Sequence, residues 1–218
     1  MLTVVVFGAT GSAGACVVRQ CLASPSVGEL RLVTRRAPAL RDPRMSIVLR
    51  DDFAHYGDGD EAFAGADLCL WCLGKSVSQV DGEAAYRRPT YDFAIAAAGA
   101  LRKASPAATF HFVSGAGAAL GSRAMWARVK AETERDLLAG TRALCWRPAA
   151  IGGHPSASEP MAYRVMRPAL WLLRPFRGLY VSGDDLGRAM LQAHADGLSG
   201  RIVENREIRD LADRYRAG

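Results

Sequence analysis

The sequence lacks the features that mark membrane and secreted proteins. None of its 218 residues belong to an uncharged apolar stretch of about 18 residues, so no membrane span is predicted. Met1 passes directly into an apolar run, with no basic segment and no small-residue cleavage site, which argues against a secretory signal. The five cysteines are an odd number in such a chain, and we interpret them as reduced thiols of a cytoplasmic protein.

Metal-ligand patterns and long runs of like charge are also lacking. The four histidines have no metal-binding spacing, so no metal site is expected. The net charge of +6 permits anionic partners, but the arginines are dispersed and no run of five basic residues occurs. We interpret them as solvated residues with a few phosphate contacts. Nucleic-acid binding is the weakest function considered, and no specific nucleic acid is expected.

The apolar residues that are present follow an alternation of strands and helices. Strands are predicted at 2–7, 29–34, 46–49, 67–73, 109–113 and 142–146, with a short one near Ile202 before a final helix. Helices are predicted at 13–23, 60–64, 83–104, 122–138 and 184–195. Pro89 is expected to kink the third helix or mark its start, and Ser122 to cap the fourth.

This alternation predicts the fold class α/β, a doubly wound parallel sheet of the Rossmann type. We expect a single domain over residues 1–218. The pattern weakens after Pro148, with a Gly/Pro/Ser loop at 151–160. Residues 150–182 are therefore expected to form a small C-terminal cap on the substrate side of the sheet.

A glycine-rich loop joins the first strand to the first helix. Its residues are Gly8, Ala9, Thr10, Gly11, Ser12, Ala13 and Gly14. The first glycine permits a tight turn, the second lets the backbone approach a pyrophosphate, and the third lets helix and strand pack closely. Free N–H groups at the helix start then face the anion. The loop predicts dinucleotide binding.

The end of the second strand indicates which dinucleotide is bound. Proteins that prefer NAD usually place an acidic residue here for the ribose 2′-hydroxyl, whereas arginine suits a 2′-phosphate. Thr34 is followed by Arg35 and Arg36, and no acidic residue occurs from Leu30 to Leu40. The sequence therefore favours NADP as the cofactor, with NAD possible.

Further segments follow in the order found in one superfamily. They are Phe7–Gly14, Thr34-Arg35-Arg36, Asp51-Asp52-Phe53, Cys69–Gly74, Phe112-Val113-Ser114, Val129-Lys130-Ala131-Glu132, Trp146-Arg147-Pro148-Ala149 and 181–190. Together they resemble the atypical and extended short-chain dehydrogenase/reductases, the NmrA-like and Tat-interacting-protein-like oxidoreductases in particular. The resemblance spans nearly the whole chain.

The resemblance implies roles for the matched positions. The Gly8–Gly14 loop would hold the pyrophosphate, and Arg35 and Arg36 the 2′-phosphate. Either Asp51 or Asp52 would contact the adenine amino group, and Leu73 and Gly74 would pass the adenosine ribose. Ser114 would polarise a substrate carbonyl or hydroxyl group, and Lys130 would hold the nicotinamide ribose. Pro148 and Ala149 would line the nicotinamide.

One departure from the family pattern bears on activity. The resembled reductases place a tyrosine, their general acid/base, four residues before the lysine, and that position is Trp126 here. An indole cannot donate and recover a proton as a phenol does. Three interpretations remain open: a non-catalytic NADP(H) sensor with a protein partner, a proton supplied by Tyr86, Tyr91 or Tyr163, or slow chemistry with Ser114 or water sufficing.

Other features are assigned structural roles. Cys69 and Cys72 have CxxC spacing, but residues three apart on a strand face opposite sides, so inert thiols are expected. His111 is expected to be a buried structural residue. His154 is the histidine expected nearest the substrate, and the apolar and basic segment 161–181 is interpreted as the cap beside the active-site mouth rather than a membrane-binding surface. The chain is expected to be a monomer or homodimer, with an unknown small-molecule substrate.

Overall fold

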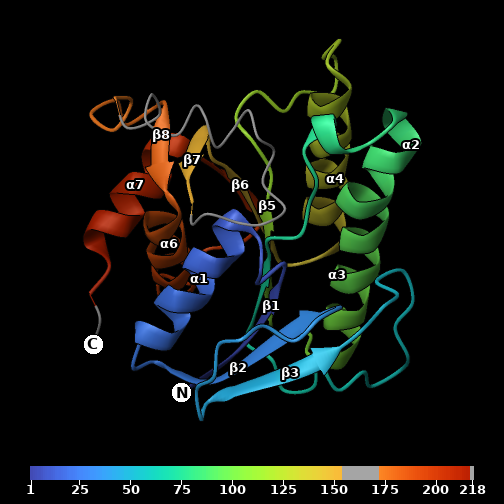
Figure 1. Ribbon diagram of the computed structural model, residues 1–218, viewed down its shortest axis with the longest axis vertical. Coiled ribbons are helices and arrows are strands. Elements are labelled where there is room, and N and C mark those ends of the chain that lie inside the picture. Colours follow the sequence, from blue (N-terminus) through green and yellow to red (C-terminus); the bar gives the residue numbers. More distant parts are fainter. Residues whose placement is uncertain (154–171, 217–218) are drawn as a thin grey trace.

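A parallel sheet organises the computed structural model, which describes residues 1–153 and 172–216. The described residues form seven parallel strands in the order β3-β2-β1-β4-β5-β6-β9. Their bounds are β1 Leu2–Phe7, β2 Val27–Thr34, β3 Met45–Leu49, β4 Leu68–Trp71, β5 Thr109–Val113, β6 Ala143–Arg147 and β9 Arg201–Glu204. Helices cover both faces of the sheet (Figure 1). This architecture confirms the predicted doubly wound α/β fold.

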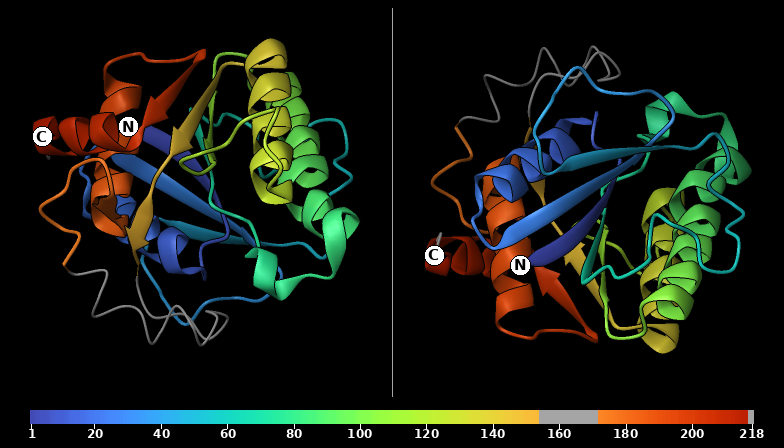
Figure 2. Two further views of the ribbon diagram at one scale, coloured as in Figure 1. Left: turned by 90° about the horizontal axis from the view of Figure 1, so that it is seen from above. Right: turned by 90° about the horizontal axis from the view of Figure 1, so that it is seen from below.

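Alternation along the buried strands creates two hydrophobic cores. In β1, Val4 and Val6 join one core, whereas Val5 and Phe7 join the other. The first core packs against α1 (Ser12–Ala23), α6 (Gly183–Ala195) and α7 (Asn205–Arg214), and the second against α3 (Phe93–Ala104) and α4 (Met125–Gly140). The views from above and below show these helix layers on opposite sides of the sheet (Figure 2). A sheet covered on both faces explains why its central strands β1 and β4 are almost entirely apolar.

Pro89 interrupts the third predicted helix as expected. The chain runs through α2 (Gly82–Arg87), a five-residue π-helical turn (Arg88–Asp92) and then α3. Proline has no N–H to donate and its ring clashes with the preceding turn, so the hydrogen-bond pattern widens there. The structure thus places an irregular turn at Pro89, where the sequence predicted a kink or a helix start.

Two local predictions are wrong. The segment 60–64 forms successive turns rather than a helix, with the Phe63 N–H donating to the Asp60 carbonyl at 2.9 Å. Gly65, at a φ of +66°, directs the chain away from a helical path. The fourth helix begins at Met125 rather than Ser122, and Ser122 Oγ instead accepts from the Ala124 N–H in the preceding turn, at 3.1 Å.

The predicted cap at 150–182 is described only at its ends. The expected loop at 151–160 starts with a strand, because β7 (Ala150–Gly152) pairs in parallel with β8 (Tyr180–Ser182). Residues 154–171, and with them His154, Tyr163 and most of the 161–181 segment, lie outside the described residues. In the part of the chain that is described, no helix combines the length and apolar character needed to cross a membrane.

Candidate functional site

A cavity of about 650 Å³ opens at the carboxyl edge of the sheet. It lies where the strand order reverses, between β1 and β4, the usual ligand-binding crevice of doubly wound sheets. The predicted site residues that line it are Gly11, Ser12, Ala13, Leu73, Gly74, Ser114, Lys130, Pro148 and Ala149. Residues from the ends of four strands, far apart in sequence, therefore share one cavity.

The glycine loop closes tightly beneath this cavity. Gly8 has a φ of +75°, and a Cβ atom there would lie 2.6 Å from the backbone of Cys72. A Cβ atom at Gly14 would lie 2.1 Å from the Gly8 carbonyl oxygen, so both positions require glycine. Gly8, Thr10 and Gly14 are not among the lining residues: they belong to the loop that presents Gly11, Ser12 and Ala13 to the cavity.

The N-terminus of α1 points its first-turn N–H groups toward the loop. Gly11 is the N-cap residue, and no side chain of the described residues caps it. The first-turn N–H groups of a helix have no acceptor within the helix, and they favour a bound anion. A dinucleotide pyrophosphate fits this end of the cavity.

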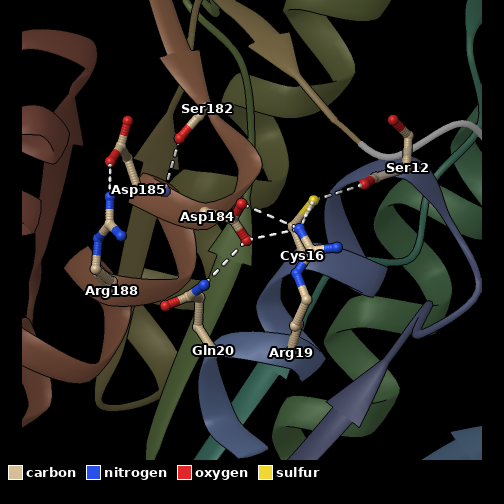
Figure 3. Close-up of polar contacts among 8 residues, drawn as sticks. All are labelled: Ser12, Cys16, Arg19, Gln20, Ser182, Asp184, Asp185 and Arg188. Atoms are coloured by element: carbon tan, nitrogen blue, oxygen red, sulfur yellow. Dashed lines mark hydrogen bonds and ion pairs between the residues drawn. The ribbon is translucent and has the colours of Figure 1, made fainter. Parts of the chain in front are cut away.

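Contacts with α6 hold α1 in place (Figure 3). The Arg19 guanidinium donates to both carboxylate oxygens of Asp184, at 2.8 and 3.0 Å, and Gln20 Nε2 donates to one of them at 3.0 Å. Cys16 Sγ lies 3.5 Å from the Ser12 carbonyl oxygen. Gly183 allows this close approach, because a Cβ atom there would lie 2.8 Å from Cys16 Sγ. The helix α1, which follows the glycine loop, is therefore held in place by its contacts with α6.

The residues predicted to bind the 2′-phosphate and the adenine amino group lie outside the cavity lining, after β2 and β3. Arg35 and Arg36 are exposed, and within residues 1–153 and 172–216 neither guanidinium has a carboxylate partner. Asp51 and Asp52 are exposed as well. Asp52 pairs with His55 at 2.6 Å and accepts from the Ala54 N–H at 2.9 Å, and these two contacts hold the pKa of Asp52 below its usual range. None of the four lines the cavity.

The other end of the cavity is buried and nearly free of charge. Ser114 is 3% exposed, and its Oγ has no hydrogen-bond partner among the described residues. The Lys130 ammonium donates to the carbonyl oxygen of the same serine. Burial lowers the pKa of Lys130 from 10.5 to about 8, although the Glu134 carboxylate acts in the opposite direction.

Trp126 occupies the tyrosine position of the resembled reductases, and it lines the cavity one turn before Lys130 on α4. Its ring lies beside the Gly115–Gly117 loop: a Cβ atom at either glycine would lie 3.7 Å from it. The two described tyrosines proposed as substitutes are elsewhere. Tyr86 is buried in the helical layer, and the Tyr91 hydroxyl donates to Asp136 at 2.6 Å.

The surroundings of Cys69, Cys72 and His111 agree with the structural roles predicted for them. Cys69 lies in the core under α3, whereas Cys72 packs toward the opposite core, and both are free thiols. Burial raises the pKa of Cys72 to about 12. His111 is fully buried, which lowers its pKa to about 3. In residues 1–153 and 172–216, no three His, Cys, Asp or Glu side chains gather as a metal site would need.

Sequence reasoning missed part of the wall contributed by the loop after β4. Lys75, Ser76 and Gln79 line the cavity. Ser76 and Gln79 form a capping box around a short 3₁₀ turn (Val77–Gln79), with the Ser76 N–H donating to Gln79 Oε1 at 2.8 Å. The S-x-x-Q pattern is a recognisable signal for such a turn, and it would have extended the predicted site beyond Gly74.

Solved structures share this architecture. An oxidoreductase of the short-chain dehydrogenase/reductase family from Burkholderia thailandensis is 17% identical, with a TM-score of 0.70 over 95% of this chain and 92% of that one. The Bordetella bronchiseptica enzyme WbmF, in complex with NAD+, is 14% identical with a TM-score of 0.68 over 97% and 76%. The ADP-L-glycero-D-manno-heptose-6-epimerase of Helicobacter pylori is 12% identical with a TM-score of 0.69 over 98% and 82%.

No protein-family model matches the chain. At these identities the structural likeness concerns the fold. It confirms the predicted resemblance at that level: the chain is a Rossmann-fold α/β protein built like the short-chain dehydrogenase/reductase structures.

Proposed function

We propose that the chain binds NADP(H) and acts as an oxidoreductase of the short-chain dehydrogenase/reductase class on a small carbonyl or hydroxyl substrate. One observation carries this proposal: a single cavity joins the glycine loop to Ser114 and Lys130. The neighbours support a nicotinamide dinucleotide, since WbmF was solved with NAD+. The arginines after β2 favour the phosphorylated form, and NAD(H) would bind more weakly.

The parts of the dinucleotide would follow the carboxyl edge of the sheet. Arg35 and Arg36 would hold the 2′-phosphate, and the Gly8–Gly14 loop the pyrophosphate. Asp51 or Asp52 would contact adenine, Leu73 and Gly74 the adenosine ribose, and Pro148 and Ala149 the nicotinamide. When bound, the nicotinamide supplies or accepts a hydride.

The chain's own residues would prepare the substrate. Ser114 Oγ, buried and without a partner in the described residues, has a free O–H to polarise a substrate oxygen. The Lys130 ammonium, fixed by the Ser114 carbonyl, would bind the nicotinamide ribose. We further propose that residues 150–182 form the substrate-side cap of one domain.

Calorimetric titration with NADPH and NADH tests cofactor binding. NADPH should bind more tightly, and Arg35→Ala or Arg36→Ala should each weaken it about tenfold or more, because a charged hydrogen bond to phosphate is lost. NADH affinity should change little. Arg102→Ala, an exposed residue in the last turn of α3, is the matched control. Failure to bind either dinucleotide would refute the proposal.

A second candidate function is a non-catalytic NADP(H) sensor that acts on a protein partner. Trp126 in the cavity favours it, because the indole replaces the usual acid/base. Single-turnover oxidation of NADPH over a panel of aldehydes and ketones separates the candidates. Activity that appears only in Trp126→Tyr supports the sensor. An active wild type that the substitution leaves unchanged excludes it.

A further inference from the structure

We propose that Lys130 itself delivers the proton to the substrate oxygen, in place of the tyrosine that is missing at position 126. This inference rests on the proposed function, and it gives Lys130 a role beyond holding a ribose. Three observations support it: the position of the Lys130 ammonium, the other titratable groups that line the cavity, and the pairing of the charged residues near Lys130.

The ammonium and the substrate-polarising hydroxyl belong to one small region. Lys130 Nζ donates to the carbonyl oxygen of Ser114, the residue whose Oγ is buried without a partner among the described residues. Lys130 also lines the cavity, and Gly115 lies against its side chain: a Cβ atom there would lie 3.5 Å from Nζ. The two remaining N–H donors of Lys130 are therefore available to a substrate oxygen that enters this end of the cavity.

Few other groups in the cavity can exchange a proton. Among the described lining residues, the titratable side chains are Cys72, Lys75 and Lys130. Burial raises the pKa of Cys72 to about 12, so it stays a thiol. Lys75 is exposed, on the loop after β4, whereas Ser114 and the carbonyl that holds Lys130 follow β5. The Trp126 indole is a donor only.

Within the described residues, Lys130 forms no ion pair with a carboxylate, because the nearest acid on its helix is paired elsewhere. Glu134 is one turn further along α4 and is 2% exposed. Its two oxygens accept from Arg147 on β6, at 2.9 and 2.6 Å, and Arg147 also reaches Glu204 at 3.1 Å. Burial therefore dominates and lowers the pKa of Lys130 to about 8, where the amine both holds and releases a proton near neutral pH.

The reductive step balances with this donor. The substrate carbonyl carbon receives a hydride from the bound reduced dinucleotide, and the π electron pair of the carbonyl moves to oxygen. That oxygen forms an O–H bond as one N–H bond of Lys130 breaks. The substrate is reduced, the dinucleotide is oxidised, and Lys130 remains as a neutral amine that water protonates again.

The first test measures the titration of Lys130 in the protein without cofactor. Brief acetic anhydride labelling from pH 6 to 11, followed by mass spectrometry, gives the labelled fraction of each lysine. We expect a midpoint near pH 8 for Lys130. The exposed Lys103 on α3 in the same digest corrects for reagent reactivity. A midpoint near the unperturbed 10.5 overturns the inference.

The second test compares pH profiles of single-turnover NADPH oxidation. The wild-type rate should fall tenfold per pH unit above about pH 8. Lys130→Arg should slow the reaction by about 10²–10⁴ and remove this decline, because arginine keeps its proton. Glu134→Gln should shift both the decline and the labelling midpoint to lower pH. Glu204→Gln, at the exposed end of the same network, should shift neither.

The outcomes separate this inference from the proposed function. If wild-type protein binds no NADPH, the proposed function fails, and the inference with it. If NADPH binds but Lys130→Arg keeps the wild-type rate and pH decline, only the inference fails. Binding without turnover at any pH also overturns the inference, and it supports the sensor.

Discussion

The two ends of the predicted cofactor site, which follows one edge of the sheet, use charge in opposite ways. Near β2 and β3, Arg35, Arg36, Asp51 and Asp52 are exposed charges whose fields water screens. Near β5 and β6, Ser114 is buried and Lys130 is half-buried, and Lys130 is the one charged side chain that the described residues place at that end of the cavity. The same sheet edge therefore carries an exposed end suited to recognising a charged ligand and a buried end suited to moving a proton.

This difference in exposure indicates at which end of the site a substitution should have the larger effect on binding or on rate. An exposed charge contributes modestly to binding because solvent competes for it. Substituting a buried polar group has a larger effect on the free energy of binding or catalysis, because an unpaired donor or charge there has no water to replace its lost partner. Variants at the buried end should thus alter rates and pH dependence, and variants at the exposed end should alter cofactor preference.

Apart from Lys130→Arg, the largest effect on turnover is expected at Ser114. Ser114→Ala should reduce turnover by about 10²–10³, because the hydrogen bond to the developing negative charge is lost. The unfolding free energy should stay the same or rise, since Oγ has no partner in the described residues and its removal leaves no donor unsatisfied. Single-turnover kinetics and urea unfolding measure the two quantities. Loss of stability together with activity would instead assign Ser114 a structural role.

The exposed end was readable from sequence because its residues are local. Each of its segments comes shortly after an apolar strand along the chain: the glycine loop, the two arginines and the two aspartates. Because parallel strands end at the same edge of a sheet, these segments are expected to lie along one edge. Strand β5 was predicted with its observed bounds, Thr109–Val113. Failures occurred where turns replaced an expected helix at 60–64 and where β7 and β8 pair across about thirty residues in three-residue strands.

For the buried end, the sequence predicted which residues line the cavity, but not their hydrogen bonds, ion pairs or pKa values. Ser114 and Lys130 were identified by resemblance, yet the hydrogen bond between them joins two elements. The pairing of Glu134 with Arg147, which leaves Lys130 without a carboxylate, depends on how α4 lies against β6. Such contacts come from tertiary packing, and spacing along the chain contains no signal for them.

An effect of intermediate size is expected on the pH dependence of the unfolding free energy, through Lys130. The native pKa of Lys130 is lowered, so between about pH 8 and 10.5 the unfolded chain binds the proton more strongly than the native one. Stability should therefore rise through this window, by about 3 kcal/mol at most from this residue. Lys130→Met should be more stable below pH 8 and lack this rise. Urea unfolding at pH 7 and pH 10 measures both, and a rise that persists in Lys130→Met would assign it to other groups.

The smallest effect is expected at the exposed end, where it distinguishes Asp51 from Asp52. His55 and Ala54 orient the Asp52 carboxylate, whereas Asp51 has no such contacts in the described chain. Asp52→Ala should therefore weaken NADPH binding by at most about fivefold, through the adenine amino group. Asp51→Ala should change it less.

The hypoxanthine analogue of NADPH, which lacks that amino group, makes this last prediction specific. Asp52→Ala should not alter calorimetric binding of the analogue if the carboxylate meets the adenine amino group. Asp58→Asn, another exposed acid outside the predicted site, should leave both ligands unaffected. If Asp51→Ala loses more NADPH affinity than Asp52→Ala, the adenine contact is assigned to Asp51. If a variant loses the same affinity for NADPH and for the analogue, its aspartate acts through its charge rather than through the amino group.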